Sequence, residues 1–132
     1  GAFTELFSKD RVKECFASKT VTFFAGGTGH PYFSTDTTAA LRAIEIEADA
    51  ILLAKNIDGV YDDDPHITPA AKRLDDLTYE EAQRRNLKVM DEAAFILCKE
   101  NNVQAVRVFG LDDPENIVRV AQGERLGSVV HP

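Results

Sequence analysis

The chain has 132 residues, which is enough for one domain, and its 44% hydrophobic and 28% charged residues are typical of a globular protein. A formal net charge of −7 argues against non-specific binding to nucleic acid or to an anionic membrane surface. No apolar run approaches the roughly 18 residues of a membrane span. The cysteines, Cys15 and Cys98, lack metal-ligand spacing. We therefore expect a single domain over residues 1–132, with reduced thiols in the cytoplasm and no nucleic-acid or membrane partner.

The predicted elements alternate between helices and apolar strands. In chain order they are helix 8–17, strand 20–25, helix 35–48, strand 50–54, an acidic loop to residue 69, helix 78–86, helix 92–101, strand 105–109, helix 114–122 and strand 128–131. Ser8 is a candidate N-cap, and Thr78 to Glu81 has the form of a capping box. Strands separated by helices predict an α/β fold, a three-layer α/β/α sandwich around a mostly parallel sheet.

A glycine loop joins the strand at 20–25 to the helix that follows it. Gly26, Gly27 and Gly29 allow positive φ and let a ligand approach the backbone closely. The N–H groups and the dipole of the following helix favour an anion. The spacing is neither a Walker pattern nor GxGxxG. A simple turn and a phosphate site both remain open from spacing alone. Asp36, in the first helical turn, could either stabilise the helix or serve phosphoryl transfer.

Four segments resemble a known family in their amino-acid sequences and in their order along the chain. They are residues 27–37 (Gly-Thr-Gly-His-Pro-Tyr-Phe-Ser-Thr-Asp-Thr), 55–65 (Lys-Asn-Ile-Asp-Gly-Val-Tyr-Asp-Asp-Asp-Pro), 87–95 (Leu-Lys-Val-Met-Asp-Glu-Ala-Ala-Phe) and 123–129 (Gly-Glu-Arg-Leu-Gly-Ser-Val). Together they resemble the C-terminal portion of bacterial uridylate kinases, in the amino acid kinase family. The resemblance implies that the N-terminal part of the fold is absent, including its lysine-containing strand and its glycine-rich phosphate loop.

The resemblance also implies an activity and the residues that serve it. The reaction would be transfer of the γ-phosphoryl group of ATP, with Mg²⁺, to uridine monophosphate (UMP), giving UDP for pyrimidine nucleotide biosynthesis. Asp36 would be the catalytic residue. The UMP-binding residues would be Thr28, Gly29, His30, Pro31, Tyr32, Phe33, Ser34 and Thr35, with His30 standing where asparagine is often found. The ATP-binding residues would be Asn56, Tyr61 and Asp64, with Asn56 chosen narrowly over Lys55. The family further implies a homo-oligomer, a hexamer.

The remaining motifs are expected to have structural roles. The acidic loop over residues 58–64 is not an EF-hand, because Val60 stands where an oxygen ligand is required, and no metal-binding residue is predicted. In the segment 87–95, Met90 and Phe95 are expected in the core. Arg107 should lie on a strand, facing a carboxylate or solvent, and is assigned no role.

Two rival functions remain open. One is another activity of the amino acid kinase family, acting on carbamate, acetylglutamate, aspartate or glutamate. The other is a non-catalytic nucleotide-binding subunit. Because the cationic phosphate clamp of the family is missing from the sequence, the isolated chain is expected to be inactive.

Overall fold

A computed structural model describes residues 3–132. The helices are α1 (Lys9–Ala17), α2 (Thr35–Glu45), α3 (Tyr79–Arg84), α4 (Glu92–Glu100) and α5 (Glu115–Ala121). The strands are β1 (Ala50–Lys55), β2 (Val60–Tyr61), β3 (Arg73–Leu74), β4 (Asp76–Thr78), β5 (Ala105–Gly110) and β6 (Ser128–His131). No helix in this described part of the chain is both long and apolar enough to cross a membrane.

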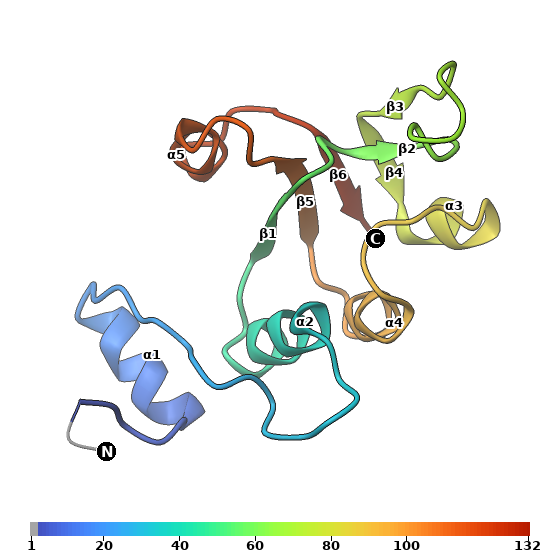
Figure 1. Ribbon diagram of the computed structural model, residues 1–132. Helices are drawn as coiled ribbons and strands as arrows, with labels where there is room; N and C mark the ends of the chain where they lie inside the picture. Colours follow the sequence, from blue (N-terminus) through green and yellow to red (C-terminus); the bar gives the residue numbers. More distant parts are fainter. Residues whose placement is uncertain (1–2) are drawn as a thin grey trace.

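The main sheet has four strands in the order β1-β5-β6-β4. β1 pairs with β5 in parallel and β4 pairs with β6 in parallel, whereas β5 and β6 are antiparallel. β2 and β3 form a separate antiparallel pair. Helices α2 and α4 lie side by side on one face of the sheet, and α5 lies on the other (Figure 1). The predicted α/β sandwich with a mostly parallel sheet is confirmed.

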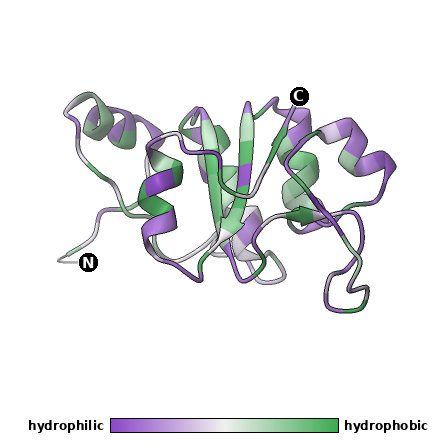
Figure 2. Ribbon diagram, turned by 90° about the horizontal axis from the view of Figure 1, so that it is seen from above, coloured by the Kyte–Doolittle hydropathy of each residue, from purple (hydrophilic) through white to green (hydrophobic). Residues whose placement is uncertain are grey.

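The hydrophobic core lies between the sheet and the α2–α4 layer. Ile51 pairs in register with Val106, and Leu53 with Val108, and all four side chains are buried. Since side chains alternate along a strand, these four point to the same face, where Ala40 of α2 is fully buried. The central strands are mostly hydrophobic, whereas the helices also carry hydrophilic residues (Figure 2). Met90 and Phe95 belong to this core, as predicted.

Helix starts follow the predicted capping signals. The hydroxyl of Ser8 accepts from the Arg11 amide, and that of Thr78 accepts from the Glu81 amide at 3.0 Å. These bonds satisfy backbone N–H groups that have no partner within their own helix.

Cys98 is buried and Cys15 is half-buried, and both are free thiols. Burial raises the pKa of the Cys98 thiol to about 11, which keeps it protonated.

The predicted strand at 20–25 is wrong for this structure. That segment is irregular, and the side chains of Val21 and Phe23 are 78% and 91% exposed. β1 is the edge strand on its side of the sheet, and no strand of the described chain pairs with residues 20–25. A β-branched, aromatic sequence forms a stable strand only where a neighbour accepts its backbone hydrogen bonds, so propensity alone did not decide this segment. The β2–β3 pair within and after the acidic loop, and β4, were not predicted.

Candidate functional site

The glycine loop reaches α2 through a run of left-handed backbone conformations. Gly26, Gly27 and Gly29 have φ of 92°, 64° and 76°. Tyr32 has φ of 74°, which is uncommon for a residue with a side chain, and its ring is fully exposed. The Thr28 hydroxyl accepts from the His30 amide at 3.1 Å, which tightens the turn. The loop therefore presents backbone and side chains to solvent just before the helix.

The first turn of α2 leaves backbone donors available. Ser34 is the N-cap, and its hydroxyl accepts from the Thr37 amide at 3.1 Å. The Thr38 amide bonds to the Ser34 carbonyl in the regular helical manner. Within the described residues, the amides of Thr35 and Asp36 donate no hydrogen bond. Two N–H groups at the positive end of a helix dipole thus remain free for an anion.

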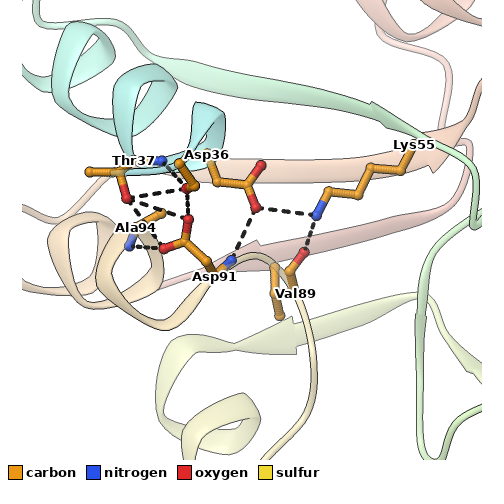
Figure 3. Close-up of polar contacts among 7 residues, drawn as sticks. Asp36, Thr37, Lys55, Val89, Asp91 and Ala94 are labelled. Atoms are coloured by element: carbon orange, nitrogen blue, oxygen red, sulfur yellow. Dashed lines mark hydrogen bonds and ion pairs between the residues drawn. The ribbon is translucent and has the colours of Figure 1, made fainter. Parts of the chain in front are cut away.

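Asp91 connects the N-termini of two helices (Figure 3). Its carboxylate caps α4 by accepting from the Ala94 amide at 2.8 Å. The same carboxylate accepts from the hydroxyl of Ser34 and from that of Thr37, the latter at 3.3 Å. The segment 87–95 therefore has a structural function that its sequence suggested only in general terms: it fixes α4 to the start of α2.

Asp36 lies beside Lys55 at this junction (Figure 3). Its Oδ2 accepts from the Asp91 amide at 3.0 Å and is 3.6 Å from Lys55 Nζ. Lys55, the last residue of β1, also donates to the Val89 carbonyl at 3.0 Å. The Asp36 and Lys55 side chains are 27% and 25% exposed, so both reach solvent. Their hydrogen bonds to the Asp91 amide and the Val89 carbonyl fix their positions. The carboxylate and the ammonium are therefore preorganised for a charged ligand.

The predicted UMP-binding residues form one continuous segment around this junction. Thr28 is half-buried and the others are exposed: Gly29, His30, Pro31, Tyr32, Phe33, Ser34 and Thr35. The structure gives Ser34 a capping role in addition to its place in this segment. Lys55, the alternative to Asn56 as an ATP contact in the sequence, pairs with Asp36 in the structure. Its position at the carboxyl end of a strand was the available signal, because ligand sites in α/β sheets lie at such ends.

The predicted ATP-binding residues lie along the segment 56–64 after β1 (the second cluster), and no hydrogen bond of the described chain joins Asn56, Tyr61 and Asp64 to one another. The Tyr61 hydroxyl donates to Asp58 at 2.5 Å, and Asp58 also pairs with Arg73 at 3.1 Å. The bond to the Asp58 carboxylate raises the pKa of Tyr61 above its usual value. The carboxylate of Asp64 accepts from the His66 amide at 2.9 Å, and Asn56 is exposed. Within the described residues, no hydrogen bond or ion pair joins this cluster to the α2 junction.

A resident metal site does not form in residues 3–132. No three side chains among histidine, cysteine, aspartate and glutamate gather there closely enough to hold a metal ion. The carboxylate of Asp36 is instead occupied by Lys55 and by the Asp91 amide.

Comparison with known proteins identifies the family. The profile of the Amino acid kinase family matches residues 2–110, which is most of the chain. The chain belongs to the amino acid kinase family. The expected resemblance is thereby confirmed, and the helix start with Asp36 and the strand end with Lys55 both lie within the matched range.

Solved structures of the family agree with this assignment over nearly the whole chain. The UMP kinase from Bacillus anthracis is 35% identical with a TM-score of 0.90, covering 99% of this chain and 54% of its own. The UMP kinase from Ureaplasma parvum is 41% identical with a TM-score of 0.84, covering 96% and 54%. The uridylate kinase from Archaeoglobus fulgidus is 35% identical with a TM-score of 0.64, covering 80% and 50%. The chain thus spans about half the length of these proteins.

Proposed function

We propose that this chain carries the acceptor loop and part of the ATP pocket of a UMP kinase, which transfers the γ-phosphoryl group of ATP to UMP. Membership of the amino acid kinase family supports the reaction class. The similarity to UMP kinase structures at 35% and 41% identity supports UMP as the acceptor. The N-terminal half of such a fold would supply the cationic groups that this chain lacks.

The observation that carries the proposal is the junction where the glycine loop enters α2 beside the Asp36–Lys55 pair. The free amides of Thr35 and Asp36 offer donors to the phosphate of UMP. The exposed segment before them, with Thr28 and His30, can contact the nucleoside. Both features support an anionic acceptor bound near the Asp36 carboxylate.

Asp36 and Lys55 would act by positioning and by charge. Phosphoryl transfer requires little covalent chemistry from the protein and depends on aligned groups and stabilised charge. Lys55 would hold the Asp36 carboxylate in position through their ion pair, and Asp36 would orient the acceptor. Mg²⁺ would arrive with ATP as part of the substrate, bound mainly by phosphate oxygens and water.

The donor nucleotide would lie against the second cluster. Tyr61, the last residue of β2, offers an aromatic face. Asp64, in the exposed loop that follows, offers a carboxylate. Asn56 is free to contact ATP from the loop after β1, whereas Lys55 is engaged at Asp36. Lys55 would therefore serve the α2 junction, and Asn56, Tyr61 and Asp64 would be the ATP-binding residues.

The decisive experiment compares ligands and variants. UMP, Mg–ATP, acetylglutamate, aspartate, glutamate and carbamate are titrated by calorimetry, and turnover is measured in a coupled assay on the protein that contains this chain. Asp36→Asn should lower kcat by about 100-fold or more while UMP affinity changes by less than about threefold. Asp10→Asn, an exposed aspartate on α1, is the matched control and should leave both unchanged.

Each outcome has a distinct meaning. Binding of another acceptor in place of UMP would assign the chain to a different branch of the family. Nucleotide binding with no turnover in any protein containing this chain would favour a non-catalytic subunit. Turnover by the isolated chain would show that the catalytic cation lies within these residues, and the proposed division between two halves would be wrong.

A further inference from the structure

A cavity of about 230 Å³ lies on the other side of the sheet from the α2–α4 layer, where β5 and β6 meet the β3–β4 segment. Its lining brings together three arginines and two aspartates: Arg73, Arg107, Arg125, Asp75 and Asp76. Arg107 comes from the middle of β5, and Arg125 from the loop before β6. In a chain with a formal net charge of −7, this lining carries three guanidinium groups against two carboxylates.

The two carboxylates of this cavity are already engaged. Asp75 pairs with Arg73 at 3.3 Å, and Arg73 also pairs with Asp58 at 3.1 Å. Asp76 accepts from His131 at 2.6 Å. Across residues 3–132, neither Arg107 nor Arg125 has a carboxylate within 4.0 Å. The two guanidinium groups therefore face the cavity without a counter-charge from the described chain.

Backbone packing brings the segments that carry the two arginines next to one another. Arg107 lies between Leu52 of β1 and Val129 of β6 in the register of the sheet, and its side chain is half-buried. The loop that carries Arg125 ends at Gly127, whose φ of 68° and close packing against Val108 and Phe109 leave no room for a side chain. The strand that carries Arg107 and the end of the loop that carries Arg125 are therefore packed together, while both long side chains still lose rotamer freedom when a ligand binds.

We propose that this cavity binds a small phosphate-bearing anion, held between Arg107 and Arg125. The planar fork of a guanidinium group matches phosphate oxygens in pairs and is the preferred side chain for that recognition. The volume is below the range of about 300 to 1,000 Å³ typical of pockets for drug-sized ligands. It accommodates orthophosphate, pyrophosphate or the phosphate end of a nucleotide, with the rest outside. Arg73 links the cavity to Asp58 and Tyr61, so an anion that attracts Arg73 would also loosen the loop after β1.

The test is a titration at constant ionic strength, followed by the side-chain Nε resonances of the arginines and by calorimetry. Orthophosphate, pyrophosphate and a nucleoside triphosphate are the probes, with sodium chloride as the reference salt. Arg107→Gln and Arg125→Gln should each weaken binding by about tenfold. Arg84→Gln, which removes an exposed arginine of α3 outside the cavity, should change it by less than about twofold.

The titration identifies the source of the anion, and it also shows whether the proposal fails. Binding of orthophosphate or pyrophosphate indicates a free-phosphate site, whereas binding of the triphosphate alone indicates the end of a nucleotide. Equal effects of all three variants, or saturation that matches chloride, would mean screening only and would overturn the proposal. If Arg107→Gln does not fold, Arg125→Gln in its exposed loop and the charge-keeping Arg107→Lys carry the test, and Lys should bind less tightly than Arg.

Discussion

Replacement of Asp91 by alanine should cost much more stability than the loss of an ordinary helix cap. The capping bond to the Ala94 amide contributes about 1 kcal/mol. The bonds from the hydroxyls of Ser34 and Thr37 to the same carboxylate add about 1 to 2 kcal/mol after discounting for partial exposure. The expected loss in the free energy of unfolding is therefore about 2 to 3 kcal/mol.

Urea unfolding followed by circular dichroism measures this loss. With a slope of about 1.5 to 2 kcal/mol per molar urea, the midpoint should fall by about 1 to 2 M. Thr78→Ala is the matched control, because Thr78 caps only α3 through the Glu81 amide and should cost about 1 kcal/mol. Asp91→Asn keeps a capping oxygen and should cost about 1 kcal/mol, through the lost charge.

A double-mutant cycle isolates the connection between the helices. Thr37→Val removes one of the hydroxyls that bond to Asp91. We expect a coupling energy between Asp91→Ala and Thr37→Val of at least about 0.5 kcal/mol, because the two side chains are in direct contact. If Asp91→Ala costs no more than Thr78→Ala and the cycle is additive, the inference that Asp91 joins α4 to α2 is refuted.

Two further predictions concern the end of the chain. Gly127→Ala should destabilise the fold by about 3 kcal/mol or more, because its φ is 68° and a Cβ would overlap the Val108 carbonyl and lie 2.8 Å from the Asp58 carbonyl; Gly123→Ala, with φ of 93° but open space around it, is the control in the same urea assay. The hydrogen bond to Asp76 raises the pKa of His131 above the value of about 6.5 expected in the unfolded chain. Its stabilising contribution is therefore fully present below about pH 6.5 and is lost as the pH rises through the folded-state pKa. Unfolding midpoints of wild type and His131→Gln should converge on going from pH 5.5 to pH 9, and a difference that grows with pH would contradict this sign.

Local sequence signals were reliable where the interaction they describe is local. Ser8 and Thr78 cap their helices because the hydroxyl and the amide it bonds to are only three residues apart. Met90 lies just before α4 and Phe95 lies within it. Both are apolar, and both side chains are buried in the core. The run Ser34 to Thr37 after the glycine loop likewise predicted a helix start with Asp36 in its first turn, where the structure has it.

Contacts between segments far apart in the sequence could not be predicted from these local signals. The predicted strand 20–25 has the composition of a strand, but a strand also needs a partner, and none of the described strands pairs with it. Asp91 reaches Ser34 across 57 positions, and Lys55 reaches Asp36 only because the end of β1 lies beside the start of α2. Composition, caps and apolar pattern thus determined the five helices, the strands β1, β5 and β6, and the α/β class. The tertiary structure alone decided which charges meet, because ion pairs and hydrogen bonds depend on separations of a few ångströms that sequence distance does not encode.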